Sequence, residues 1–129
     1  MHIHKVLLVD DDPDIRRLGE LSLSRVGGWD TVVVGSGAEA VEAAADDDPP
    51  DAIVLDVMMP DMDGVTTLQQ LRSGERTSGI PVVFMTAKVQ QSDVETYLAA
   101  GACGVISKPF DPMTLPGKLV ETLSGPSGP

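Results

Sequence analysis

Several kinds of residue are scarce in this chain, and each shortage excludes a class of protein. One cysteine among 129 residues, Cys103, rules out an internal disulfide and suits a reducing cytoplasm. We expect Cys103 to be a small buried residue, not a reactive thiol. No apolar run is long enough to cross a bilayer, and the N-terminus leads into a strand without a signal peptide. These absences predict a cytoplasmic protein with no membrane contact.

Basic and aromatic residues are also few. Nine Lys and Arg stand against 20 Asp and Glu, the formal net charge is −11, and aromatics make up 3% of the chain. Nucleic-acid affinity comes from cationic side chains on phosphate and from aromatic side chains stacked on bases, so we expect no nucleic-acid contact by this domain. An acidic chain suits a divalent cation or a partner with a basic surface.

The length fits one domain with a real core. Short apolar runs alternate with segments of helical period, which predicts an α/β domain. We expect strands at 5–9, 31–34, 51–55, 80–85 and 103–107, and helices at 14–26, 36–44, 64–72, 92–100 and 114–123. The first helix should turn Ile15, Leu18, Leu21 or Leu23, and Val26 inward. Residues 1–123 then form the domain, and 124–129 form a flexible tail or linker.

Five such alternations predict a parallel sheet covered on both faces, with right-handed crossovers. Domains of this kind commonly take the strand order 2-1-3-4-5, and ligands bind at the carboxyl ends of the strands where that order reverses. The residues expected there are Asp10, Asp11 and Asp56, with Thr86 and Lys108 arriving from the fourth and fifth strands.

The third apolar run stops abruptly at Asp56. Pro60 removes a backbone donor, and Gly64 tolerates a positive φ, so a loop should follow. Taken alone, this stretch fits a turn-capping aspartate as well as a functional one. The position of Asp56 at the reversal of strand order favours the functional interpretation.

Three converging carboxylates repel one another unless a cation joins them, and Mg²⁺ accepts carboxylate oxygens while keeping several waters. Thr86 offers a hydroxyl to a phosphoryl oxygen, and Lys108 offers a compact positive charge. An aspartate can attack phosphorus to form an aspartyl phosphate. The cluster therefore predicts magnesium-dependent phosphoryl chemistry.

Four segments resemble the receiver domain of bacterial two-component response regulators, of the chemotaxis-regulator type. They are Leu8-Val9-Asp10-Asp11-Asp12-Pro13, Leu55-Asp56-Val57-Met58-Met59-Pro60-Asp61-Met62-Asp63-Gly64, Met85-Thr86-Ala87 and Lys108-Pro109-Phe110. The resemblance spans Lys5 to about Leu123 and implies a flavodoxin-like, doubly wound five-stranded sheet with five helices. It also implies a cis peptide at Lys108–Pro109.

Carried over by position, the resemblance makes Asp56 the phosphoacceptor. Asp10, Asp11, Asp56 and the backbone carbonyl of Met58 would bind Mg²⁺, and Thr86 and Lys108 would contact the phosphoryl group. The implied donor is a sensor histidine kinase or a histidine phosphotransfer protein, and the implied output is a downstream effector protein. Such a chain is a conformational switch or phosphorelay step, a monomer or weak dimer, and not an enzyme in the turnover sense.

One position departs from the family pattern. Val105 stands where family members often carry an aromatic residue that swings inward, and a β-branched side chain is too stiff and small for that motion. Met58 and Lys88 occupy positions that in the family influence water near the aspartyl phosphate. Since a thioether hydrogen-bonds water poorly, we expect no built-in acceleration of dephosphorylation.

Two other functions remain open from the residues. A haloacid-dehalogenase-like phosphohydrolase would use Asp10 as nucleophile, but it leaves Asp56 unexplained and lacks that family's residue type at Asp14. A receiver-like docking module that is never phosphorylated is the other.

His2 and His4 share one face of the extended N-terminus and could chelate a metal together, although surface positions are the commoner outcome.

Overall fold

The computed structural model describes residues 2–124 as a five-stranded, entirely parallel sheet. Its strands run in the spatial order β2-β1-β3-β4-β5, which confirms the predicted order and the predicted reversal between β1 and β3. Their bounds are Lys5–Val9 for β1, Asp30–Val34 for β2, Ala52–Asp56 for β3, Val82–Thr86 for β4 and Gly104–Ser107 for β5. Every residue of β3 and β4 is buried, as expected for strands covered on both faces.

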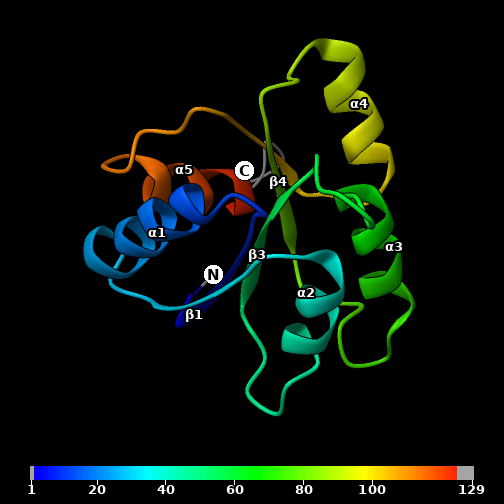
Figure 1. Ribbon diagram of the computed structural model, residues 1–129, viewed down its shortest axis with the longest axis horizontal. Coiled ribbons are helices and arrows are strands. Elements are labelled where there is room, and N and C mark those ends of the chain that lie inside the picture. The colour runs from blue at the N-terminus through cyan, green and yellow to red at the C-terminus, as the bar shows by residue number, and fades with distance from the viewer. Residues whose placement is uncertain (1, 125–129) are drawn as a thin grey trace.

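Helices cover both faces of the sheet (Figure 1). Their bounds are Pro13–Leu21 for α1, Gly37–Ala44 for α2, Gly64–Ser73 for α3, Gln91–Ala99 for α4 and Leu115–Ser124 for α5. One core cluster joins the sheet to α2, α3 and α4 through Ala40, Leu68 and Tyr97. The other joins it to α1 and α5, and Leu115 lies fully buried within it. Within residues 2–124, no helix has the length and apolar character to span a membrane.

The prediction of one regular helix over 14–26 was wrong. After Leu21 the chain widens into a π-helical turn, η1 (Ser22–Val26), and the Ser22 hydroxyl donates a hydrogen bond to the carbonyl of Pro112. Of the two predicted alternatives, Leu23, which lies in the wide turn, is buried in the core and Leu21 is exposed. Leu18, before the turn, and Val26, at its end, are exposed as well, contrary to prediction. Upstream, Gly19 lets α1 pack closely, since a Cβ there would lie 2.3 Å from the Leu8 side chain.

The loop after β3 forms as predicted, but the role of Gly64 in it differs from the predicted one. Positive φ occurs at Asp61, at 68°, and not at Gly64. Gly64 is needed for close approach, because a Cβ there would lie 2.5 Å from the backbone oxygen of Asp56. The beginning of α3 is thereby pressed against the end of β3.

Three further expectations have different outcomes. Cys103 is exposed, contrary to prediction, and it lies just before β5. The Lys108–Pro109 peptide is cis, as the resemblance implied. The predicted flexible tail lies outside the described residues apart from Ser124, which ends α5.

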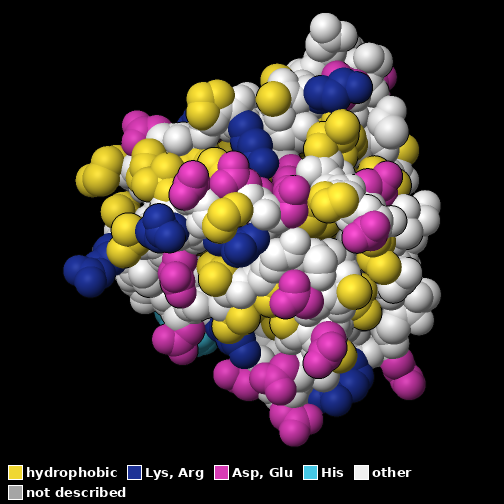
Figure 2. Space-filling view, viewed as in Figure 1, with side chains coloured by type: hydrophobic (Ala, Val, Ile, Leu, Met, Phe, Trp, Pro, Cys, Tyr) yellow, Lys and Arg dark blue, Asp and Glu magenta, His cyan; other side chains and the backbone are white. Residues whose placement is uncertain are grey.

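The surface carries its acidic side chains in clusters. Figure 2 shows one at the lower end of the molecule, over the loop between α2 and β3, where residues 46–48 are three exposed aspartates. We call residues 46–48 the acidic loop. It lies at the amino end of β3, at the opposite end of the sheet from Asp56.

Candidate functional site

The carboxyl ends of β1 and β3 bring the predicted aspartates together. Val9 pairs with Leu55 in the parallel register, so Asp10 and Asp56 leave adjacent strands at the same level. Asp10 is fully buried, Asp56 is 3% exposed, and Asp11 is exposed. One carboxylate oxygen from each of Asp10, Asp11 and Asp56 lies within 4.8 Å of the others. The three acids that sequence reasoning assigned to a shared cation therefore converge.

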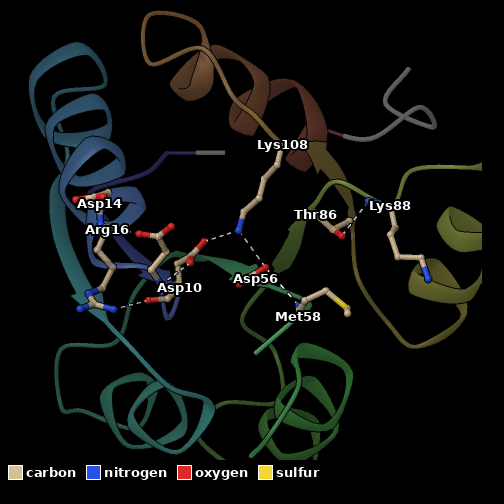
Figure 3. Close-up of polar contacts among 9 residues, drawn as sticks. Asp10, Asp14, Arg16, Asp56, Met58, Thr86, Lys88 and Lys108 are labelled. Carbon is tan, nitrogen blue, oxygen red and sulfur yellow. Dashed lines mark hydrogen bonds and ion pairs between the residues drawn. The ribbon is translucent and has the colours of Figure 1, made fainter. Parts of the chain in front are cut away.

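Lys108 extends from the loop after β5 between two of these acids (Figure 3). Its Nζ lies 2.8 Å from Asp10 Oδ2 and 3.2 Å from Asp56 Oδ1. Its backbone N–H donates to the carbonyl of Thr86 at 2.9 Å, which fixes this loop to the end of β4. Among the described residues, the only cation in direct contact with the buried acids thus comes from the loop after β5.

Burial and the neighbouring charges shift the pKa of two groups here. Loss of hydration, followed by the negative charge of Asp10, raises the pKa of Asp56 to about 6, and the positive charge of Lys108 opposes that rise. Burial acts to lower the pKa of Lys108. The hydrogen bond and charge of Asp10, reinforced by Asp56, outweigh it and raise that pKa above its ordinary value. Lys108 is therefore charged at neutral pH. Of the two groups, Asp56 is the one whose protonation changes at a pH near neutral, since its pKa is about 6.

The acids fit a hard divalent cation. Asp10 Oδ2 is buried, and within residues 2–124 its one polar partner is the ammonium group of Lys108, 2.8 Å away. Lys108 is shared between two carboxylates and leaves them incompletely neutralised, and carboxylate oxygens are the ligands that Mg²⁺ prefers. A bound dication would satisfy this oxygen and relieve the repulsion that raises the pKa of Asp56.

The remaining predicted residues border the same hollow, which has a volume of about 330 Å³ and is lined by Asp10, Asp11, Asp12, Asp56, Met58, Thr86, Ala87 and Lys108. The buried Thr86 hydroxyl accepts from the Lys88 N–H at 3.1 Å, while the Lys88 side chain points away (Figure 3). The Met58 N–H donates to Asp56 Oδ1 at 3.3 Å, and the Met58 side chain is 64% exposed. A larger hollow of about 490 Å³ lies between α2 and the β1–β2 edge and contains none of these residues.

Sequence reasoning missed one residue that supports the site. Arg16 on α1 donates from Nη1 to the backbone carbonyl of Asp10 at 2.8 Å, and so fixes the end of β1 (Figure 3). Asp10 Oδ1 also accepts the N–H of Asp12 at 2.9 Å. The apolar periodicity of the first helix carries no signal for Arg16, because a half-buried arginine on a helix reads as a surface cation.

Removing the Asp56 charge should stabilise the metal-free fold at neutral pH. A carboxyl with a folded pKa of about 6 and an ordinary value of 3.8 holds its proton more tightly when folded. Its ionisation therefore lowers the free energy of unfolding as pH rises through that interval, by about 3 kcal/mol at most. We expect the free energy of unfolding of Asp56→Asn to exceed that of the unchanged protein by about 2–3 kcal/mol at pH 7.5, with little gain at pH 4.

Urea unfolding with a chelator present, at both pH values, measures this difference. Excess Mg²⁺ should shrink the gain at pH 7.5, because the ion stabilises the carboxylate that the variant lacks. A gain of equal size at pH 4 and pH 7.5 would show that Asp56 does not titrate in the expected interval.

Fold and site together define the class of protein: a doubly wound α/β domain with a cluster of acids at the carboxyl ends of its strands, where the strand order reverses. The chain belongs to the response regulator receiver domain family, whose sequence pattern matches residues 6–120. The predicted family is thereby confirmed over nearly the whole chain.

Individual relatives agree with this assignment. The DNA-binding response regulator MtrA of Mycolicibacterium smegmatis is 37% identical over 115 residues, which is 89% of this chain and 48% of MtrA. The chain thus spans about half the length of that relative. Among solved structures, chemotaxis protein CheY4 of Vibrio cholerae superposes with a TM-score of 0.85 at 30% identity, covering 95% of this chain and all of CheY4.

A third similar structure contains a metal. The receiver domain of sensor histidine kinase PA1611 from Pseudomonas aeruginosa was solved with a magnesium ion coordinated in its active-site cleft. It is 29% identical, with a TM-score of 0.78, and the match covers 95% of this chain and 96% of that one. The ion is a property of that structure, and it agrees with the donor set found here.

Proposed function

We propose that this receiver domain is a phosphorylation switch in which Asp56 is the phosphoacceptor. The observation that carries the proposal is the position of Asp56, a buried carboxylate at the end of β3 that shares the cation of Lys108 with Asp10. In the step we propose, an Asp56 oxygen attacks phosphorus as the phosphorus–nitrogen bond of a phosphohistidine breaks. The phosphoryl group moves to Asp56, and the histidine side chain leaves.

This chain's residues position and neutralise the reacting groups. We assign Asp10, Asp11, Asp56 and the backbone carbonyl of Met58 to Mg²⁺, which when bound screens the charge of the phosphoryl oxygens. The charged Lys108 pairs with a phosphoryl oxygen, and the Thr86 hydroxyl donates to another. Since Lys108 and Thr86 are already joined through their backbones, the loops after β4 and β5 respond to the new charge together.

The phosphoryl group carries roughly −1.5 to −2 charges and replaces the single negative charge of the Asp56 carboxylate, at a position where Lys108 now pairs with two acids. That change biases the two loops between alternative arrangements, which is what makes the chain a stoichiometric switch instead of a turnover enzyme. Val105 is half-buried and packs against the core cluster with α2, α3 and α4, so the proposed switch operates without an aromatic side chain at that position.

The proposed partners follow from this role. The phosphoryl donor is a histidine kinase or a histidine phosphotransfer protein of the cytoplasm, and the output is an effector protein or an effector domain beyond the receiver. Residues 1–123 are the proposed unit of phosphorylation, acting as a monomer or weak dimer. We assign no nucleic-acid contact to this domain because of its acidic surface.

Intact-mass measurement after incubation with acetyl phosphate and Mg²⁺ tests the proposal. A switch gains one labile phosphoryl group per chain and releases inorganic phosphate no faster than that group decays. A phosphohydrolase that uses Asp10 would instead release phosphate continuously from small esters while the mass stays unchanged. A docking module would show neither result.

The lifetime of the phosphorylated state provides a second prediction. Because the exposed Met58 thioether cannot orient a water molecule toward phosphorus, we expect the unchanged protein to lose its phosphoryl group no faster than Met58→Asn. The asparagine variant should decay severalfold faster, since an amide can hold the attacking water. Radiolabel decay after removal of the donor measures both rates, and a much faster loss from the unchanged protein would contradict the expectation.

A further inference from the structure

The chain's two histidines lie together at the start of the fold, at the opposite end of β1 from the acidic site. The ring centroids of His2 and His4 are 4.5 Å apart, the ring planes are nearly perpendicular at 84°, and both residues are exposed. We propose that His2 and His4 form a binding site for a divalent transition metal, with Cu²⁺ bound more tightly than Ni²⁺ or Zn²⁺.

The backbone of His4 and the side chain of Ile3 are held in place before any metal binds. Ile3, between the histidines, is 9% exposed and anchors the segment in the core cluster shared with α1 and α5. The N–H of His4 donates to Asp51 Oδ2 at 2.8 Å, and its carbonyl accepts from the Asp30 N–H at 2.9 Å. His2 and His4 flank the buried Ile3 and are both exposed, so their imidazoles lie outside the core. The anchored backbone of His4 lowers the ordering that a bound metal has to impose.

The spacing of the rings suits two ligands on one ion. With metal–nitrogen bonds of about 2.0–2.1 Å, two imidazoles at a right angle on one ion have centroids roughly 4.5 Å apart. The observed separation of 4.5 Å matches that value, so we expect rotation of the two side chains to bring one nitrogen of each ring to a shared ion. Imidazole nitrogen is a preferred ligand of copper, nickel and zinc, whereas Mg²⁺ prefers oxygen. The pair is therefore chemically distinct from the carboxylates at the other end of β1.

Fixed negative charge lies beside the histidines. The hydrogen bond from the His4 N–H holds the pKa of Asp51 below its usual range, in spite of some burial, so this carboxylate is ionised at neutral pH. The acidic loop is close as well, because the Lys5 side chain forms ion pairs with Asp46 at 3.8 Å and Asp48 at 3.7 Å. A surface of this charge attracts dications and lowers the cost of placing one beside the two imidazole rings.

Copper titration of the full chain with excess Mg²⁺ present tests the proposal, because magnesium competes for the acidic site and not for imidazole. We expect one Cu²⁺ per chain, with an electron paramagnetic resonance signal that shows two imidazole nitrogens. His4→Gln should weaken binding at least tenfold and remove one of these nitrogens. Since the chain has no other histidine, the signal has a single origin.

Asp56→Asn is the matched control, and it should bind copper as the unchanged protein does. Circular dichroism of His4→Gln should be unchanged, since the lost side chain is exposed. Equal copper affinity in His4→Gln and the unchanged protein, or a complex with only one imidazole nitrogen, would assign the metal to the chain terminus with His2 alone and overturn the two-histidine site. Loss of binding in Asp56→Asn would place the copper at the carboxylates and overturn it as well.

Discussion

Asp56→Asn should abolish phosphorylation by acetyl phosphate, with labelling reduced at least a hundredfold at equal protein concentration. The amide has the shape of the carboxylate but lacks the charge and the nucleophilic oxygen that attack phosphorus. Because we expect this variant to be more stable than the unchanged protein at neutral pH, loss of labelling cannot be attributed to unfolding. Intact mass in the presence of Mg²⁺ measures the phosphorylated fraction directly.

Asp61→Asn is the control that matches this change in chemistry. Asp61 is exposed, lies in the same loop, and has a φ of 68° that asparagine also tolerates. We expect labelling of Asp61→Asn to stay within about twofold of the unchanged protein, since surface substitutions away from a site have small effects. If Asp56→Asn were labelled as strongly as Asp61→Asn, the phosphoacceptor would be another residue, and mapping of the labelled peptide would locate it.

Lys108→Met should destabilise the metal-free protein at pH 7.5 by about 3 kcal/mol. Removing one member of a buried charged group leaves the others without compensation, and here two buried acids lose their only direct cation among the described residues. The pKa of Asp56, already raised to about 6, should rise further because Lys108 acts against that rise. Methionine keeps the length of the side chain, so the loss reflects charge more than packing.

Urea unfolding of Lys108→Met should therefore respond to metal and to pH. Excess Mg²⁺, or a lower pH that protonates Asp56, should recover part of the lost stability, since either one removes the uncompensated charge. Lys118→Met makes the same change on the exposed face of α5 and should alter stability by less than about 0.5 kcal/mol. A loss in Lys108→Met that neither Mg²⁺ nor acid reduces would mean that the lysine contributes through packing instead of charge.

The sequence predicted the sheet and the convergence of the acids because both follow from local signals. Five apolar runs, each ended by polar residues, fix which strand ends carry Asp10, Asp56 and Thr86. The parallel topology then brings those ends to one edge, whatever the details of the helices. Strand bounds were accordingly right to within about two residues.

The features that sequence reasoning missed depend on contacts between distant segments. Nothing local in residues 14–26 reveals a π-helical turn, because the Ser22 hydroxyl in that turn donates its hydrogen bond to the distant carbonyl of Pro112. The tight fit of Gly64 against Asp56 depends on the path of a whole loop, and glycine alone suggested a positive φ instead. Likewise the bond from Arg16 to the Asp10 carbonyl requires α1 to be placed on the sheet first.

The wide turn at the end of α1 has a mechanical consequence. The Ser22 hydroxyl donates a hydrogen bond to the carbonyl of Pro112, four residues beyond Lys108. This bond connects the end of the first helix to the segment that carries the lysine. If the proposed phosphorylation displaces Lys108, the bond between Ser22 and Pro112 is a contact through which the end of α1 would be displaced as well. The exposed side chains of Leu21 and Val26, which lie before and after Ser22 in the chain, would then shift on the outer surface when Lys108 moves in the buried site.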